Sequence, residues 1–413
     1  MCSLQLRESW DEAYTAFCEL GIGKDFSNIL LAGRFSASLN WPHLIEIMEQ
    51  LVDASLPKIR RLRATPVNVP LARPHPTASG VVNSAPLVLM DLETDQGLTG
   101  HAYVFCYTPI ALKPIAELIE ALQPLIQGDA VAPLVLAQKL QGRFRLLGPQ
   151  GFTGIAMAAI DMAAWDVLAK SAGLSLTRLL GGEEKPVPAY HSLGMAGPDG
   201  AAQEAAESIE LGFRCVKFKV GYPHVEQDRA VIGAARGAAG KDLQVMVDYN
   251  QSLSVPEAIG RVQLLEEEAL VWVEEPTRAD DFAGHARIAA ECRTPIQIGE
   301  NLWGPHDLTK SLSVGASDFV MLDVMKIGGI TGWLRAVSQA EAAGLPVSSH
   351  LFPELSAQLL AISPHAHWLE YQDWAAPILE RPLELKDGFA LPQKEAGGGL
   401  AWDKDAVERY RVC

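Results

Sequence analysis

Short apolar runs alternate with amphipathic stretches along the second half of the chain. The apolar runs predict buried strands and the stretches between them predict helices; examples are 215–220, 245–248 and 319–323 for strands, and 256–268 and 331–343 for helices. A strand and a helix recur together about every 20–30 residues, which is typical of parallel strands joined by helices. We therefore expect residues 186–370 to form a (β/α) barrel.

Residues 58–185 have a different order of elements. Strand-like runs at 58–69, 85–92 and 101–107 come first, and helical patterns at 112–126, 133–140 and 154–171 follow. This order predicts an α+β capping domain, onto which the irregular, Pro- and Gly-rich segment 371–413 folds back. The fold class we expect is α/β: a modified (β/α)8 TIM barrel with an α+β capping domain formed by N-terminal and C-terminal segments.

The start of the chain gives a separate expectation. Leu6, Trp10, Tyr14, Phe17 and Leu20 are spaced as one face of a helix. Residues 1–57 are therefore expected to form an N-terminal helical extension, to which we assign no chemistry.

Composition and charge narrow the classes of partner. The chain has 413 residues, of which 48% are hydrophobic, and a net charge of −16. Nucleic acids and anionic membrane surfaces are bound by clustered Lys and Arg, so this charge argues against both as partners. We expect a small-molecule carboxylate as substrate, held by the local positive charge of Lys217, Lys219, Lys326 and a metal ion.

Three further features predict a cytoplasmic protein. The six cysteines are scattered without a Cys-x-x-Cys pair, which is typical of free thiols in a reducing compartment. No apolar run approaches the length of a membrane span, about 20 residues. The N-terminus lacks the basic start, apolar core and small-residue cleavage site of a secretory signal.

Three acidic residues follow apolar runs at about one βα period. Asp248 ends Val-Met-Val-Asp, Glu274 lies in Trp-Val-Glu-Glu-Pro, and Glu300 ends Ile-Gln-Ile-Gly-Glu. The C-terminal strand ends of a barrel carry its chemistry, because each end is fixed by the core and faces an open pocket. Carboxylates crowded there repel one another, so a hard cation is their natural partner. We expect one divalent cation, Mg²⁺ with Mn²⁺ as the alternative.

Two lysines, Lys217 and Lys219, lie at i and i+2 of one predicted strand and so share a face. Two ammonium groups inside a barrel would be costly without a role. Each lysine lowers the pKa of the other, and a metal ion would lower both, so one lysine can be neutral near about pH 7 and act as a base.

His350 ends a predicted strand, and Asp323 ends the strand before it. Asp323 can accept a hydrogen bond from one ring nitrogen of His350 and hold the other toward the pocket, which fixes the tautomer and raises basicity. This pair would lie opposite Lys219. Glu370, in the last strand, is either an ion-pair partner or an acid that hydrogen-bonds a substrate oxygen. Glu275 is expected to face away from Glu274 by strand alternation.

Together these groups favour proton chemistry beside a carboxylate. A metal ion and Lys217 would bind the carboxylate and stabilise the enediolate that forms when the α-carbon loses its proton. Two bases on opposite faces permit racemisation, whereas loss of a β-hydroxyl would be dehydration. We predict a Mg²⁺-dependent racemase of a 2-hydroxy carboxylic acid. The alternative is an acid-sugar dehydratase that forms a 2-keto-3-deoxy acid, and a third possibility is a non-catalytic barrel that binds small molecules.

From about residue 61 to the C-terminus the chain resembles the mandelate racemase group of the enolase superfamily. Long strings show the resemblance, among them Val67-Asn68-Val69-Pro70-Leu71-Ala72, Ile160-Asp161-Met162-Ala163-Ala164-Trp165-Asp166, Val247-Asp248-Tyr249-Asn250-Gln251-Ser252-Leu253 and Ser348-Ser349-His350-Leu351-Phe352. The resemblance implies a mandelate-like substrate, a symmetric homo-oligomer, and Mg²⁺ held by Asp248, Glu274 and Glu300.

The resemblance also implies a role for each remaining candidate. Lys219 is the base on the S side, and His350 with Asp323 is the base on the R side. Lys217 touches the substrate carboxylate and Glu370 is the electrophilic acid. Ser192 and Asn250 contact the substrate.

The chain departs from this family where the substrate is selected. In the family a loop from the cap closes the pocket with apolar side chains. The matching stretch 73–82 retains Val82 but has His75 and Ser79 where valines are expected, and Gln372 stands where the family has leucine. Such polar groups would lack partners against a phenyl ring and favour a hydroxylated substrate. We therefore count His75 among the candidate substrate-binding residues.

Overall fold

The computed structural model describes residues 56–78 and 80–412. The predicted N-terminal extension, residues 1–57, lies outside the described residues except for its last two positions.

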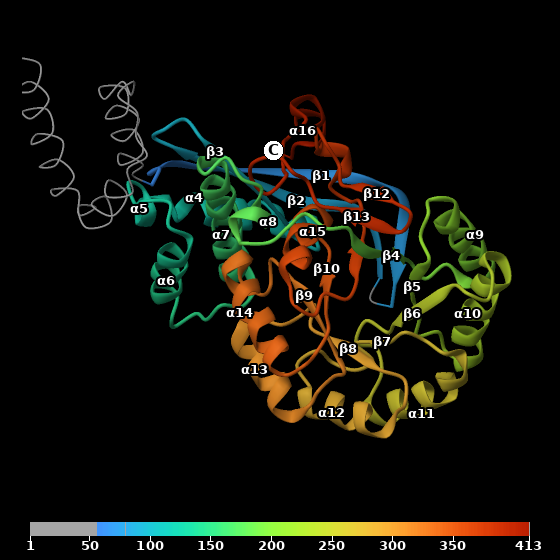
Figure 1. Ribbon diagram of the computed structural model, residues 1–413. Helices are drawn as coiled ribbons and strands as arrows, with labels where there is room; N and C mark the ends of the chain where they lie inside the picture. Colours follow the sequence, from blue (N-terminus) through green and yellow to red (C-terminus); the bar gives the residue numbers. More distant parts are fainter. Residues whose placement is uncertain (1–55, 79, 413) are drawn as a thin grey trace, which may run out of the picture. The chain divides into compact units, whose positions relative to one another are not determined.

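Eight parallel strands form the centre of the described chain (Figure 1). They are β4 (Val187–Leu193), β5 (Cys215–Lys219), β6 (Gln244–Asp248), β7 (Val273–Glu274), β8 (Ile296–Ile298), β9 (Phe319–Asp323), β10 (Val347–His350) and β11 (Leu369–Tyr371). Strands β4 to β10 pair in chain order, and β11 pairs with β4. Backbone bonds from Ser349 N to Trp368 O (3.0 Å) and from His367 N to Val347 O (2.8 Å) join β10 to the segment entering β11, so the sheet closes into a barrel.

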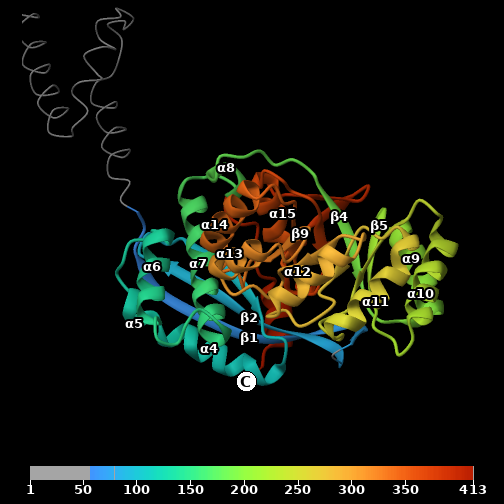
Figure 2. The ribbon, with the colours of Figure 1, turned by 90° about the horizontal axis from the view of Figure 1, so that it is seen from below.

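A helix follows each strand except the last and lies on the outside of the barrel (Figure 2). These helices are α9 (Gly197–Glu210), α10 (Val225–Ala239), α11 (Val255–Leu265), α12 (Phe282–Glu291), α13 (Pro305–Val314), α14 (Gly329–Ala342) and α15 (Pro353–Ile362). After β11 the chain leaves the barrel for the C-terminal segment. The predicted fold class, a modified (β/α)8 barrel with a cap, is confirmed.

Strand alternation decides which side chains enter the barrel. The side chains that point into the barrel form a small buried cluster of Tyr190, Cys215, Met246, Trp272 and Met321. The side chains that point outward belong to the layer packed under the surrounding helices, among them Val216, Phe218, Val245 and Val247. Because side chains alternate along a strand, Lys217 and Lys219 share the inner face with Cys215, and Asp248 shares it with Met246. The apolar cluster fills the barrel below, so the polar side chains collect at the C-terminal mouth.

The cap is an antiparallel sheet with helices on it. Its strands are β1 (Ile59–Thr77), β2 (Gly80–Thr94) and β3 (Thr99–Phe105) in that order, and its helices are η1 (Pro109–Ala111), α4 (Leu112–Ala121), α5 (Gln123–Ile126), α6 (Pro133–Arg143), α7 (Gly151–Ser171) and α8 (Leu176–Leu179). The stretch 112–126, predicted as one helix, is two helices. Pro124 has no N–H to continue the helical ladder, so the chain restarts at Gln123.

The C-terminal segment contains η3 (Ala376–Ile378), β12 (Glu384–Lys386), β13 (Phe389–Leu391) and α16 (Lys404–Tyr410). Strand β13 pairs antiparallel with β4 of the barrel. Trp402 Nε1 donates to Asp91 on β2 (2.8 Å), and Gly398 N donates to Asp166 on α7 (2.6 Å). The segment therefore contacts both the barrel and the cap.

The expectation that no apolar stretch has the length of a membrane span is wrong, because helix α7 has that length. By length and composition alone, its 21 residues could cross a membrane, but 78% of its 18-residue apolar window is buried inside the protein. It contributes Ile155, Ile160 and Val167 to the same core as cap strand residues. Such burial on all sides is typical of a core helix.

Candidate metal centre and active site

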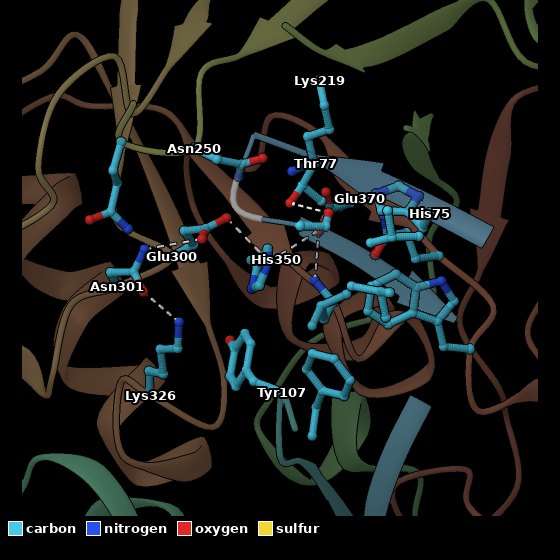
Figure 3. A pocket seen from close by; sticks show the side chains of 18 residues that line it. His75, Thr77, Tyr107, Lys219, Asn250, Glu300, Asn301, Lys326, His350 and Glu370 are labelled. Carbon is cyan, nitrogen blue, oxygen red and sulfur yellow. Dashed lines mark hydrogen bonds and ion pairs between the residues drawn. The ribbon is translucent and has the colours of Figure 1, made fainter. Parts of the chain in front are cut away.

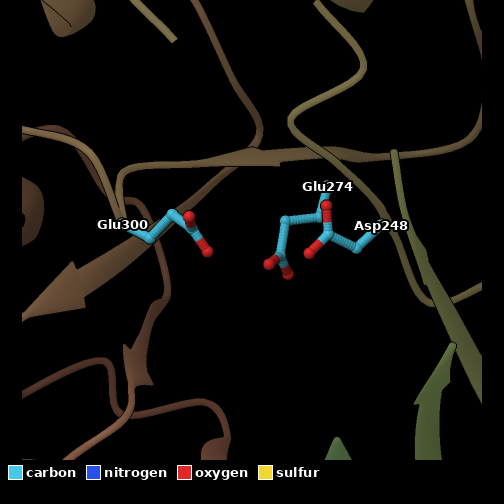
Figure 4. A group of neighbouring side chains, drawn as sticks. All are labelled: Asp248, Glu274 and Glu300. Carbon is cyan, nitrogen blue, oxygen red and sulfur yellow. The ribbon is translucent and has the colours of Figure 1, made fainter. Parts of the chain in front are cut away.

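The three predicted metal ligands lie together at the barrel mouth (Figure 4). Asp248 and Glu274 end β6 and β7, and Glu300 lies two residues beyond β8. Each offers a carboxylate oxygen, and these oxygens lie within 4.8 Å of one another. All three side chains are buried. Adjacent parallel strands end at the same edge, which is why acids one βα period apart in sequence meet here.

The chemistry of this group fits a hard divalent cation. Burial of several carboxylates is costly unless positive charge is present. The pKa of Glu274 is raised to about 8, because burial and the neighbouring Asp248 and Glu300 outweigh the effect of Lys217. Glu300 Oε2 has no hydrogen-bond partner among the described residues. An all-oxygen donor set of this kind suits Mg²⁺ or Mn²⁺.

Both lysines of β5 contact this acidic group. Lys219 Nζ is paired with Asp248 Oδ2, and Lys217 Nζ lies 2.6 Å from Glu274 Oε1 and 2.8 Å from Glu370 Oε1. We expected the pKa of Lys219 to be lowered by Lys217. Without a metal ion it is raised, because Asp248, with Glu300 and Glu274, outweighs burial and the charge of Lys217; the lowering that a bound metal ion would add stays a prediction. Sequence spacing revealed the neighbouring lysine but not the direct ion pair.

His350 and Asp323 form the predicted pair. His350 Nδ1 lies 2.7 Å from Asp323 Oδ2, and Nε2 points to the other side, 3.2 Å from Glu300 Oε2. Strands β9 and β10 are neighbours with Asp323 and His350 in register, which places the two side chains side by side. The pKa of His350 is raised, because Glu300, Glu370 and Asp323 together outweigh the effect of burial.

Glu370 is held as an ion-pair partner. Besides Lys217, it accepts a hydrogen bond from Leu351 N at 2.9 Å. Burial would raise the pKa of Glu370, but the charges of Lys217 and His350 outweigh burial and lower it. Glu370 is therefore an ion-pair partner of Lys217 in this structure, and its role as an electrophilic acid stays a prediction.

These groups open into a cavity of about 430 Å³ between the barrel mouth and the cap (Figure 3). Six predicted site residues line it: His75, Lys219, Asn250, Glu300, His350 and Glu370. The other candidates, Lys217, Asp248, Glu274, Asp323 and Ser192, are buried behind that lining. The roles expected of Lys217 and Ser192, which require contact with a substrate, stay predictions.

Asn250 and Ser192 have different neighbours. Asn250 donates to Asp248 from its backbone N (2.6 Å) and from Nδ2 (3.1 Å), and its Oδ1 has no partner among the described residues. Its φ of 43° lies in the left-handed region, which Asn tolerates better than most residues. Ser192 Oγ accepts a hydrogen bond from Gln372 Nε2 at 3.1 Å.

The wall of the cavity includes residues that sequence reasoning did not assign to the site. Phe105 ends β3, Tyr107 lies two residues after it, and Trp374 comes from the C-terminal segment. The centre of the Phe105 ring lies 4.6 Å from that of Tyr107 and 5.1 Å from that of Trp374. The His75 ring meets Trp374 edge-on at 5.5 Å. Trp374 is far from Phe105 and Tyr107 in the sequence. The one sequence signal for this wall was the position of Tyr107 at the end of a predicted strand.

The stretch 73–82, expected as a loop, is a continuation of β1 and β2. His75 pairs with Val82 and Thr77 with Gly80 in this hairpin, after a register shift between Pro70 and His75. Met195 N donates to Pro76 O at 2.8 Å, so the hairpin tip rests on the loop after β4. His75 and Val82 line the cavity, and Ser79 lies outside the described residues.

Glu275 corrects one expectation. Strand β7 ends at Glu274, and Glu275 has a φ of 35°, so strand alternation no longer directs its side chain. Asn301 Nδ2 donates to Glu275 Oε2 at 2.8 Å and to Glu300 Oε1 at 3.0 Å. Glu275 therefore lies beside the acidic group rather than on the opposite face.

Two family models match the chain, one over the cap and the other over most of the barrel and the C-terminal segment. Residues 59–181 match the N-terminal domain of the mandelate racemase / muconate lactonizing enzyme family, and residues 200–406 match the model described as enolase C-terminal domain-like. The chain belongs to the enolase superfamily. The first match covers the cap and the second covers the strands that supply the acidic group and both candidate bases.

Relatives within the superfamily differ in their reactions. An enolase from Bradyrhizobium, crystallised with magnesium and mandelic acid, is 43% identical over 87% of this chain and all of its own, with a TM-score of 0.84. L-Talarate/galactarate dehydratase of Salmonella typhimurium is 36% identical over 263 residues, which are 63% of this chain and 66% of the relative. L-Talarate dehydratase of Polaromonas sp. JS666, crystallised with Mg and L-glucarate, is 30% identical over 86% of this chain and 98% of its own, with a TM-score of 0.78.

Proposed function

We propose that this superfamily member is a Mg²⁺-dependent racemase of a mandelate-like 2-hydroxy carboxylic acid. The main support is that two candidate bases, Lys219 and His350, line the same cavity. In the sheet, the strands of the acidic group, β6 to β8, lie between β5 with Lys219 and β10 with His350. A substrate carboxylate at the acidic group would therefore have one base on each side of its α-carbon.

Each base would handle a proton at one face of the α-carbon. When bound at Asp248, Glu274 and Glu300, Mg²⁺ supplies positive charge that stabilises the negative charge building up on the substrate carboxylate. Lys219 Nζ removes or returns the proton on one face. His350 Nε2 does the same on the other face, with Nδ1 held by Asp323 at 2.7 Å.

The aromatic wall supports a ring-bearing substrate. The Phe105 ring contacts those of Tyr107 and Trp374 along the cavity, and Val81 and Val82 add apolar surface from the hairpin. Aromatic rings pack favourably at these centroid distances, about 4.5–7 Å. The mandelic acid in the Bradyrhizobium relative belongs to the same substrate class.

The second candidate is an acid-sugar dehydratase, and two polar side chains favour it. His75 and Gln372 line the cavity, where a sugar hydroxyl could hydrogen-bond to them and a phenyl ring could not. The pKa of His75 is lowered to about 3, mainly by burial, so its ring is neutral and can pair with a hydroxyl. The names of the two dehydratase relatives, L-talarate/galactarate dehydratase and L-talarate dehydratase, give hydroxylated acids of this class as substrates.

Proton NMR in D₂O separates the two reactions. The purified protein with Mg²⁺ is incubated with mandelate, lactate and six-carbon sugar acids. Loss of the α-hydrogen signal with racemisation and no new product supports the racemase. A 2-keto-3-deoxy product supports the dehydratase. No exchange and no product with any of these acids would count against both.

Stereospecific exchange tests the assignment of the two bases. His350→Asn is expected to abolish turnover of the R substrate while exchange of the α-hydrogen of the S substrate continues through Lys219. Lys219→Ala should do the reverse. If neither variant lost exchange on one face, the two-base arrangement would be wrong.

A further inference from the structure

A hydrogen-bonded chain runs behind the third acidic ligand. Lys326 Nζ donates to Asn301 Oδ1 at 2.6 Å, and Asn301 Nδ2 donates to Glu300 Oε1 at 3.0 Å and to Glu275 Oε2 at 2.8 Å. Asn301 follows Glu300 directly, whereas Lys326 comes from the loop after β9. Figure 3 shows the three labelled side chains Lys326, Asn301 and Glu300 in sequence along one wall of the cavity.

The donor and acceptor chemistry of this chain permits only one orientation of the amide. A lysine ammonium can only donate, and an ionised carboxylate can only accept. Asn301 stands between the two and has one group of each kind. With Oδ1 toward Lys326, Nδ2 must face the carboxylates; a flipped amide would place an oxygen against Glu300 and an N–H₂ group against an ammonium.

Lys326 is itself held in place. Its side chain is 5% exposed, and Nζ lies 4.5 Å from the centre of the Tyr107 ring. Its backbone N donates to Asp323 Oδ1 at 2.8 Å. The ammonium therefore sits between an aromatic face from the cap and an amide from the barrel, and both contacts favour a cation there.

We infer that Asn301, with its amide orientation fixed by Lys326, holds the Glu300 carboxylate in the position in which it can bind the metal ion. Asn301 donates to one oxygen of Glu300, Oε1, while the other, Oε2, faces His350 Nε2 at 3.2 Å and accepts no hydrogen bond from the described residues. Asp248 and Glu274 are each positioned by a lysine of β5, and the Lys326–Asn301 chain is the corresponding device for Glu300. Asn301 and Lys326 are positioning residues in this scheme.

The test is the affinity for Mg²⁺, measured by calorimetry on the full chain without substrate. Asn301→Leu, which is similar in size and cannot hydrogen-bond, is expected to raise the Kd about 10- to 100-fold, the usual effect of losing a group that orients a metal ligand. Lys326→Met should raise it similarly, and Lys326→Arg, which keeps a donor-only cation, should restore part of the loss. Gln203→Leu removes an exposed amide donor to Glu207, and Lys310→Met removes an exposed partner of Asp307; both controls should bind Mg²⁺ as the wild type does.

The double variant tests whether Lys326 acts through Asn301. If it does, Lys326→Met adds nothing to the Kd once Asn301 is leucine, whereas independent effects would multiply. An unchanged Kd in both single variants would overturn the inference, as would tighter binding after loss of the Lys326 charge. Circular dichroism checks that each variant is folded; if Asn301→Leu is not, the Lys326→Met and Lys326→Arg pair decides. Because no substrate is present, the result is independent of the proposed reaction.

Discussion

Asp323 decides which nitrogen of His350 faces the cavity. Lys326 N donates to Asp323 Oδ1 at 2.8 Å, and the other carboxylate oxygen meets His350 Nδ1 at 2.7 Å. In Asp323→Asn, the same backbone N–H would keep the amide oxygen and turn the N–H₂ group toward His350. The neutral ring would then carry its proton on Nε2 and could not act as a base there.

We therefore expect Asp323→Asn to slow proton exchange of the R substrate by about 10²- to 10⁴-fold, the usual contribution of a general base. Exchange of the S substrate through Lys219 should change little. Deuterium incorporation followed by NMR for each enantiomer measures both rates. Equal losses for the two enantiomers would show that Asp323 supports the site as a whole rather than one base.

At this scale the sequence predicted the residues that end strands and missed the contacts between loops. Asp248, Glu274 and Glu300 could be placed together because each closes an apolar run one βα period after the last. The link from Lys326 to Asn301 joins two loops whose paths the apolar pattern does not encode. The misplacement of Glu275 has the same origin, since alternation holds only inside a strand and β7 ends one residue earlier.

The β1–β2 hairpin forms part of the cavity wall through His75 and Val82. Its tip rests on Gly194, where an added Cβ would lie 2.9 Å from Cδ of Pro76 and 3.2 Å from its carbonyl oxygen. Gly194→Ala should therefore displace the hairpin that carries His75 and Val82. Overpacking of this kind costs about 1–3 kcal/mol, which corresponds to a rise in KM of roughly 5- to 150-fold if the cost falls on the closed hairpin.

Steady-state kinetics and Mg²⁺ calorimetry together check this. The KM should rise while the Kd for Mg²⁺ stays that of the wild type, because the acidic group lies on other strands. Gly233→Ala on α10, where an added Cβ meets nothing within 4 Å, is the matched control and should leave KM unchanged. A wild-type KM in Gly194→Ala would show that the hairpin does not define the cavity.

A second contact between elements makes stability depend on pH. Tyr103 on β3 donates to Glu354 Oε2 on α15 at 2.8 Å, and Glu354 is buried. Burial raises the pKa of Glu354 from 4.5 to about 6. The protonated form is favoured in the folded protein, so this contribution to stability is complete below about pH 4.5 and is lost as the pH rises through about 6.

Glu354→Gln should remove that dependence while keeping an oxygen for Tyr103 to donate to. A pKa difference of about 1.5 units corresponds to about 2 kcal/mol, so the variant should be more stable than the wild type by that amount at pH 8 and by less at pH 5. Denaturant unfolding at both pH values measures the difference. A variant less stable than the wild type at pH 8 would mean that the ionised carboxylate makes favourable contacts of its own.

On the scale of the molecule, the fold class could be predicted because the βα period is repeated many times. The division of the core into separate buried clusters could not be predicted. One buried cluster contains cap residues such as Leu87 together with Val320, Leu322 and Val347 of β9 and β10, whereas Val216, Val245 and Val273 of β5 to β7 belong to another. Apolar patterning shows that a strand is buried but does not show which layer covers it.

This division predicts that the cap and the β9–β10 side of the barrel lose structure together. Leu87 on β2 is 1% exposed, and Leu87→Ala should cost about 2–5 kcal/mol. Because its core is continuous with that of β10, hydrogen exchange should show the same loss of opening free energy for amides of β2 and of β10. Leu264→Ala on α11, where the side chain is 54% exposed, should alter neither. If Leu87→Ala weakened the amides of β2 alone, the cap would be an independent folding unit, and the cavity between cap and barrel could open without any loss of structure in the barrel.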